Sequence, residues 1–189
     1  MSAAMSDDGA LPEPADVLAF WRAAGPEKWF HKDAAFDAEI AARYRAGIEA
    51  AAAGHLAHWE TTAEGALALV ILLDQFPRNI FRGSARAFAA DPLARAVAGR
   101  AIARGFDQHI PKAERLFFYL PFEHSEERAD QERAVALVRA LGDAEQLKWA
   151  ELHADIIRRF GRFPHRNAAL GRTTSPAEQA FLDDGGFNG

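Results

Sequence analysis

A run of eight apolar residues, ALALVILL at positions 66–73, constrains the fold of this chain more than any other segment. It is far shorter than the roughly 20 residues that cross a bilayer, so it predicts a buried element and not a membrane span. A helix that is apolar on every side has no face to present to water. Alanine is abundant, and no long stretch alternates apolar and polar residues as strands do. The run therefore predicts the central helix of an all-α fold.

Helix start and stop signals divide the rest of the chain. They predict helices near residues 14–24, 34–53, 62–75, 91–104, 112–119, 125–141, 144–160 and 176–183. Capping boxes are expected for the pairs Thr61 with Glu64, Asp143 with Gln146, and Ser175 with Glu178. Left-handed C-terminal caps are expected at Gly105, Gly142 and Gly161.

Two further positions are interpreted as helix starts. Asp91 before Pro92 is typical of an N-cap followed by a first-turn proline. Ser125, which acidic residues follow, is interpreted as an N-cap as well. Together the signals predict a single all-helical domain of about seven to eight helices over residues 14–184. Flexible ends are expected at residues 1–13 and 185–189.

Composition excludes several classes of protein. At 189 residues the chain suits one domain with a sizeable core. A net charge of −5 argues against general nucleic-acid binding, which usually needs a basic face. The absence of cysteine excludes disulfides, iron–sulfur clusters, thiolate zinc sites and a cysteine nucleophile, and agrees with a reducing cytoplasm. Residues 1–14 lack the apolar core of a signal peptide. We therefore expect a cytoplasmic protein without nucleic-acid or membrane partners.

Three polar segments stand where a helical protein would ordinarily have short polar turns. DQFPRN at residues 74–79 and RFPHRN at residues 162–167 are variants of one phrase, and PFEHSE at residues 121–126 lies between them. They gather arginine, histidine, carboxylate and amide groups beside aromatic rings and prolines. We expect them to form parts of one site.

Asp74 is the residue that ties these segments to the apolar helix. It is predicted at the C-terminal end of that helix, where the backbone carbonyls already make the surroundings electronegative. Burial of an unpaired carboxylate is costly, so Asp74 requires a cation. The candidate cations are Arg78, Arg82, Arg162 and Arg166. Two interpretations stay open: a structural ion pair that locks a loop, or an aspartate that orients an arginine toward a ligand.

Residues 158–172 contain five arginines, one histidine and no acid, whereas residues 123–132 contain five acids. Guanidinium forks suit carboxylates and phosphates. The two segments therefore either neutralise one another or leave an anion site. We expect side chains from all three polar segments to converge, namely Asp74, Arg78, His124, Arg162 and Arg166.

The candidate ligand-binding residues are Asp74, Gln75, Arg78, Asn79, Arg82, Glu123, His124, Glu126, Gln131, Arg162, His165, Arg166, Asn167 and Arg172. Candidates for an acid–base group are His124, His165 and Glu123, because imidazole titrates near neutral pH. His153 lies on an apolar stripe and is interpreted as a core histidine. The histidines and carboxylates lack the spacing of a known metal motif, so no metal site is predicted. No glycine-rich loop follows a strand, which excludes the usual nucleotide cradles.

Several motifs resemble those of one family. They are Lys28-Trp29-Phe30, LLDQFPRN at residues 72–79, Phe81-Arg82-Gly83, LPFEHSE at residues 120–126, Asp130-Gln131, FGRFPHRN at residues 160–167 and Leu170-Gly171-Arg172. With these motifs the chain resembles the mainly bacterial domain of unknown function 924 family, from Phe20-Trp21 to the final helix. The resemblance implies an all-helical fold similar to tetratricopeptide-like superhelices. It implies no activity.

The leading functional hypothesis is a protein that binds a small anionic molecule through arginine, with a histidine as acid–base group. One alternative is a tetratricopeptide-like module that binds a peptide. Another is a purely structural polar network. A deep cleft lined by the three polar segments would favour the small ligand, and a long open groove would favour the peptide. If Arg166 faces a ligand, we expect it to be partly solvated; if it is structural, we expect it to pair with Asp74 or Glu123.

Overall fold

The computed structural model describes residues 11–189, and every regular element among them is helical. The α-helices are α1 (Pro14–Ala24), α2 (Pro26–Trp29), α3 (Ala34–Ala52), α4 (Ala63–Val70), α5 (Phe76–Ile80), α6 (Asp91–Ala103), α7 (Leu116–Glu123), α8 (Arg128–Leu141), α9 (Ala144–Phe160) and α10 (Pro176–Asp183). The predicted all-α class and single domain are confirmed. Most of the predicted N-terminal tail lies outside the described residues.

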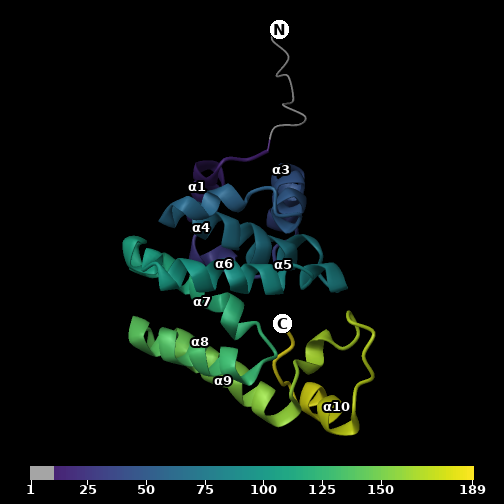
Figure 1. The fold of residues 1–189 in the computed structure, drawn as a ribbon. Helices are drawn as coiled ribbons and strands as arrows, with labels where there is room; N and C mark the ends of the chain where they lie inside the picture. Colours follow the sequence, from purple (N-terminus) through teal and green to yellow (C-terminus); the bar gives the residue numbers. More distant parts are fainter. Residues whose placement is uncertain (1–10) are drawn as a thin grey trace.

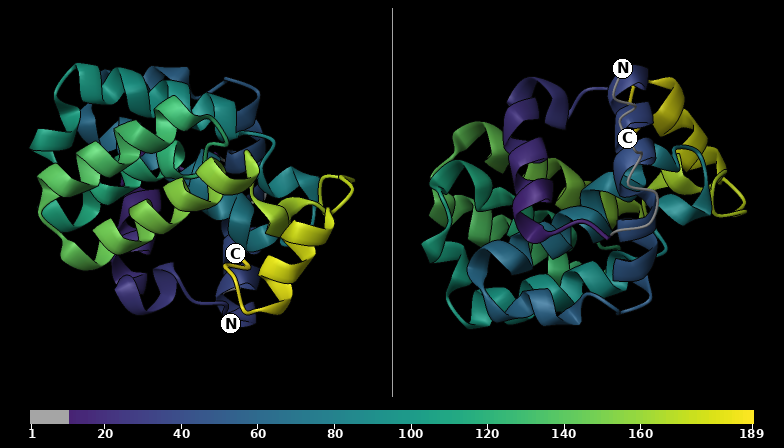
Figure 2. Two further views of the ribbon diagram at one scale, coloured as in Figure 1. Left: turned by 90° about the horizontal axis from the view of Figure 1, so that it is seen from below. Right: turned by 90° about the horizontal axis from the view of Figure 1, so that it is seen from above.

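The helices stack largely in chain order. α1 packs on α4, α4 on α6, α6 on α7, α7 on α8 and α8 on α9. Figure 1 shows this stack, with α10 to one side near the end of α9. Seen from below, α8 and α9 run side by side across one face (Figure 2, left). This packing of successive neighbours is compatible with a tetratricopeptide-like superhelix.

The apolar run lies at the centre of the stack, as predicted. α4 and the turn that follows it carry residues 66–73, of which none is more than 3% exposed. α1, α6 and α7 all pack against α4. Among residues 11–189, no helix is both long and apolar enough to cross a bilayer.

The central helix does not end at Gln75, contrary to the prediction. It passes through one π turn, Ile71–Gln75, in which the Phe76 N–H donates to the Ile71 carbonyl five residues earlier. It then continues as α5, with Pro77 in the first turn, where a missing N–H is tolerated. Asp74 therefore occupies a buried turn inside a continuous helical segment. π turns frequently occur at functional sites.

Three predicted helix starts are wrong by a few residues. Thr62, not Thr61, caps α4 by accepting a hydrogen bond from the Gly65 N–H at 3.0 Å. Asp91 is the first residue of α6 and not its cap, so its carboxylate is free to act elsewhere. Glu127 is the N-cap residue of α8, instead of Ser125.

The remaining predictions of helix caps and helix starts are confirmed in part. Ser175 and Glu178 form the predicted capping box at α10. Asp143 caps α9, but the reciprocal contact from Gln146 that a capping box requires does not occur there. The predicted left-handed glycines have φ angles of 69–74°. α7 begins at Leu116 and not near residue 112, because residues 112–114 form a separate 3₁₀ turn.

We expect Gly65→Ala to destabilise the protein by about 1–3 kcal/mol, although alanine is the better helix former. A Cβ atom at Gly65 would lie 2.2 Å from the backbone oxygen of Trp59, which cannot rotate away. Gly99, inside α6, is the matched control because its nearest neighbour would be Phe122 Cζ at 3.7 Å. Gly99→Ala should stabilise by up to about 1 kcal/mol. Urea unfolding of both variants checks this, and a gain of stability in both would contradict it.

Candidate functional site

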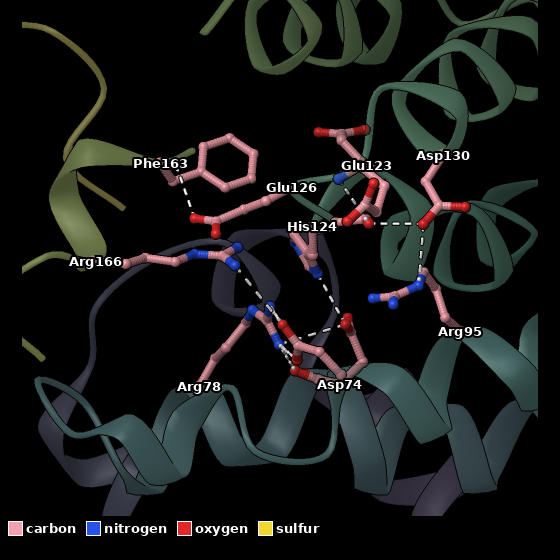
Figure 3. A network of polar contacts seen from close by, with 12 residues as sticks. Asp74, Arg78, Arg95, Glu123, His124, Glu126, Asp130, Phe163 and Arg166 are labelled. Carbon is pink, nitrogen blue, oxygen red and sulfur yellow. Dashed lines mark hydrogen bonds and ion pairs between the residues drawn. The ribbon is translucent and has the colours of Figure 1, made fainter. Parts of the chain in front are cut away.

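Five charged or titratable side chains meet above the π turn, and we call them the arginine centre: Asp74, Arg78, Asp91, His124 and Arg166. They come from the central helix, the start of α6, the end of α7 and the 3₁₀ turn Pro164–Arg166. Figure 3 shows Arg78 and Asp74 rising from one side, His124 descending toward them, and Arg166 entering from the segment after α9. Residues that are up to 92 positions apart in sequence therefore face one another.

Asp74 is fully buried and accepts hydrogen bonds on both carboxylate oxygens. Gln75 Nε2 donates to Oδ2 at 2.6 Å, and His124 Nδ1 lies 2.8 Å from Oδ1. Arg78 Nη1 is 3.3 Å from the same Oδ1. Burial alone would raise the pKa of Asp74, but His124 and Arg78 lower it to about 2. Asp74 is therefore ionised at neutral pH and holds the ring of His124 in place.

Arg78 donates hydrogen bonds to a carboxylate and to a backbone carbonyl. Its Nη1 and Nη2 donate to the two carboxylate oxygens of Asp91 at 2.8 and 2.9 Å, and Nη1 also donates to the Asp74 carbonyl at 2.8 Å. The fork-to-fork arrangement with Asp91 is the strong geometry for an arginine–carboxylate pair. The neighbouring carboxylates hold the pKa of Arg78 above its ordinary value, despite burial.

Arg166 differs from Asp74 and Arg78 because its charged group lacks hydrogen-bond partners in the described part of the chain. It is 6% exposed, yet no hydrogen bond from its guanidinium occurs within residues 11–189, and its Nε is buried without a partner. The nearest carboxylate oxygen, Oδ2 of Asp91, is 3.8 Å away from Nη1 and already bonds Arg78. The guanidinium carbon lies 4.6 and 4.5 Å from the ring centres of Phe88 and Phe163. Burial and repulsion by Arg78 lower the pKa of Arg166 to about 10, so it remains a cation.

Both expectations for Arg166 are thereby corrected. It is not partly solvated, because two aromatic rings enclose its guanidinium. It also makes no hydrogen bond to Asp74 or Glu123 in the described residues, because Arg78 and the histidines take those carboxylates. A buried guanidinium with unused donors is energetically unfavourable.

His124 presents one free ring nitrogen. With Asp74 ionised, the Nδ1–H is the natural donor to Oδ1, which leaves the lone pair on Nε2. No partner of Nε2 occurs among the described residues. Burial and the adjacent Arg78 lower the pKa of His124, so the ring is neutral at pH 7. A buried aspartate that fixes the tautomer of a neutral histidine is the arrangement that general bases use.

The remaining predicted residues form separate clusters. Asn79 and Arg82 both donate to Asp37 of α3. Arg172 makes a two-pronged contact with Glu126 at 2.7 and 3.0 Å and also donates to Asn167. Gln131 donates to the backbone carbonyls of residues 123 and 125. These contacts lie within the protein and are of the kind that fixes loops.

Arg162 does not reach the arginine centre, contrary to expectation. Its Nε and Nη2 donate to the carboxylate of Glu178 at 2.5 and 2.8 Å. Glu178 is 3% exposed and belongs to the capping box of α10, so the pair fastens α10 to the segment after α9. Within the phrase RFPHRN, Arg166 belongs to the centre and His165 lies beside it.

Glu123 and two histidines form a second buried group. His153 Nδ1 lies 2.8 Å from the Trp149 carbonyl, its hydrogen-bond partner, and 2.9 Å from Glu123 Oε1. His165 Nδ1 is buried without a partner. The ring centre of Phe187, in the predicted flexible end, lies 4.5 Å from that of His153 and 5.1 Å from that of His165. No set of three or more metal-ligating side chains occurs in the described part of the chain.

His165 should make the protein sensitive to acid. Burial and the neighbouring Arg166 lower its pKa from 6.5 to about 3. Because the folded-state pKa is depressed, the stability contribution is complete above pH 6.5 and is lost as pH falls toward 3. When the pH falls from 7.5 to 5, the unfolding free energy of both proteins should fall. The decrease should be about 1–2 kcal/mol smaller in His165→Phe than in wild type.

Urea unfolding at the two pH values measures this difference. The exposed His55 supplies the control, because His55→Phe should follow the wild-type acid dependence. An equal loss of stability in wild type and His165→Phe would contradict a neutral, buried His165.

Some members of the site carried no recognisable signal in the sequence. Asp91 was interpreted only as a helix cap, since an Asp-Pro pair is common at helix starts. In the sequence Phe88 and Phe163 are ordinary apolar residues, and only the fold places the Arg166 guanidinium between them. Asp37 lies in the first turn of α3, where acidic residues are frequent.

The clearest surface hollows lie away from the arginine centre. One of about 400 Å³ lies between α1 and α3, and another of about 630 Å³ lies between α8 and α9. None of the predicted site residues lines either of them. The arginine centre instead meets solvent through Arg78 and His124, whose side chains are 20% and 16% exposed.

Comparison with known proteins supplies the family. The family model described as bacterial protein of unknown function (DUF924) matches residues 17–186. The chain belongs to the DUF924 family. The solved structure of the protein of unknown function ATU0120 from Agrobacterium tumefaciens is similar to this DUF924 chain, with 52% identity and a TM-score of 0.88. The match covers 90% of this chain and 97% of that one. No curated protein matches.

Proposed function

We propose that this protein binds a small anionic molecule, carrying a carboxylate, phosphate or sulfate group, at the arginine centre. The observation that carries the proposal is Arg166, a buried cation with no hydrogen-bond acceptor in the described residues. An oxyanion beside it would satisfy N–H groups that the protein leaves unused.

The neighbours of Arg166 support the same proposal. Arg78 lies next to it, held by Asp91 and Asp74, so its position does not depend on the ligand. Two guanidinium groups close together repel one another, as the lowered pKa of Arg166 reflects. An anion between them would relieve that repulsion, and His124 Nε2 is available as a third polar contact.

A purely structural role explains the clusters around Arg162 and Arg172 better than it explains the arginine centre. In the Glu126–Arg172 and Glu178–Arg162 pairs, each guanidinium meets a carboxylate directly. A protein selected only for stability would gain from an apolar side chain in place of Arg166, since unpaired buried polar groups destabilise. A bound ligand would explain why this chain has an arginine at position 166.

Thermal unfolding with a panel of oxyanions tests the proposal. At a ligand concentration 100 times its Kd, a bound ligand adds about 2.7 kcal/mol to the unfolding free energy. We expect sulfate, phosphate or a small carboxylate to raise the wild-type midpoint by about 5–10 °C. Arg166→Met should abolish the shift caused by binding.

The matched control is Arg139→Met, which removes an equally charged side chain from an exposed pair with Glu151. Sulfate also stabilises proteins without binding, through exclusion from the surface. That effect is shared by both variants, so the informative quantity is the difference between them. An equal midpoint shift in wild type, Arg166→Met and Arg139→Met for every anion would reject the proposed site.

A further inference from the structure

We infer that anion binding at the arginine centre is coupled to the uptake of one proton by Nε2 of His124. The inference rests on the proposed function and concerns the regulation of that same site. It follows from the charges that face one another there and from the one ring nitrogen left free.

The empty centre is electrically balanced. Asp74 and Asp91 supply two negative charges, and Arg78 and Arg166 supply two positive ones. A divalent oxyanion such as sulfate would leave this buried group with a net charge of −2. Uncompensated charge is unfavourable away from water, so a nearby group that can take up a proton will do so.

His124 is the group placed for that role. Its Nδ1 is committed to Asp74, while Nε2 carries a lone pair and has no partner among residues 11–189. Protonation turns Nε2 into a hydrogen-bond donor, and the ion pair with Asp74 then becomes stronger. The proton therefore adds both charge balance and a contact to the anion.

Other charged groups surround the imidazole ring of His124 and determine whether it is protonated when no anion is bound. Those facing His124 from the elements packed against it are Asp74 and Arg78 on the central helix, Asp91 on α6, and His165 and Arg166 on the turn after α9. In the segment next to His124, Glu123 faces His153, and Glu126 is paired with Arg172. His165 is the one rival proton acceptor among these, and its Nδ1 is fully enclosed.

Calorimetric titration with sulfate is the first measurement. Sulfate does not titrate near neutral pH, so any proton taken up must come onto the protein. Titrations at pH 7.5 in two buffers of different ionisation enthalpy count these protons. We expect between one half and one proton per sulfate, and an affinity that falls up to tenfold per pH unit above neutrality.

Histidine side-chain NMR identifies the acceptor in the wild-type protein. On saturation with sulfate, the ¹⁵N signals of His124 should change from the neutral to the imidazolium pattern. His124→Asn assigns those signals by their absence, and its amide keeps a donor toward Asp74. His165→Phe serves as the control and should still take up the proton.

The outcomes are distinct. Sulfate binding without proton uptake, or with uptake on His165, overturns the inference and leaves the proposed function standing. Absence of any sulfate binding to the wild-type protein, in a panel where a carboxylate or phosphate binds, overturns the inference alone. Absence of binding by every anion overturns both.

Discussion

Asp74→Asn should lower the melting temperature by about 10 °C or more. The carboxylate is fully buried and faces three donors, from Gln75, His124 and Arg78. An asparagine amide offers one acceptor and turns its own N–H groups toward the others. Breaking a buried charged network in this way costs about 3–5 kcal/mol, and each kcal/mol is worth about 2–4 °C in a domain of this size.

The control for Asp74 is Asp183→Asn, which makes the same change of charge at an exposed position near the end of α10. It should leave the midpoint within a degree or two of wild type. The penalty at Asp74 should also shrink in acid. Because the folded-state pKa is about 2 and the ordinary value is 3.8, the contribution of the ionised carboxylate is full above pH 3.8 and is lost below it. Equal midpoints for the two variants at pH 7 would refute this account of Asp74.

Arg78→Met should destabilise the protein much more than Arg166→Met, although the two arginines are neighbours in one centre. Arg78 neutralises Asp91 and Asp74, so its removal leaves two buried carboxylates short of a cation and should cost about 3–5 kcal/mol. Arg166 supplies the second positive charge of the centre, but it lies 3.8 Å from Asp91 and makes no hydrogen bond to either carboxylate in the described residues. Its removal relieves repulsion with Arg78 and buries an apolar chain between two rings.

For Arg166→Met we expect a melting temperature within a few degrees of wild type, because the relief of repulsion by Arg78 offsets the loss of one positive charge near Asp91. The loss of attraction to Phe88 and Phe163 works against the gain, since each such contact is worth about 0.5–2 kcal/mol. Urea unfolding of both variants at pH 7 and low salt measures the contrast. A similar, large destabilisation by both substitutions would mean that Arg166 is structural after all.

The fold was predictable because its strongest signals are local. The run at residues 66–73 permits no position except the centre, and Asp143 and Ser175 cap their helices through neighbours two or three residues away. The extent of the central helix was not predictable in the same way. Pro77 normally ends a helix, and only the π turn before it lets the helix continue.

The site was predictable only in part, for a different reason. That Asp74 needs a cation follows from burial, and arginines were plentiful in the right segments. Which arginine pairs with Asp74 depends on other carboxylates that have no visible role in the sequence. Asp91 forms an ion pair with Arg78, and Glu178 forms one with Arg162. Ion pairs between residues far apart in the sequence produce no periodic pattern, so the sequence alone does not reveal them.

The π turn adds one residue between the apolar run, residues 66–73, and the arginine-bearing helix α5. An α-helix turns by about 100° per residue, so the extra residue sets the angular phase of everything after Val70. If Ile71–Gln75 formed an ordinary α turn at the same chain length, the apolar run would still be buried, but Arg78 and Asn79 would point about 100° away from their partners. The orientation of Arg78 toward the arginine centre therefore depends on whether this one turn closes over five residues or over four.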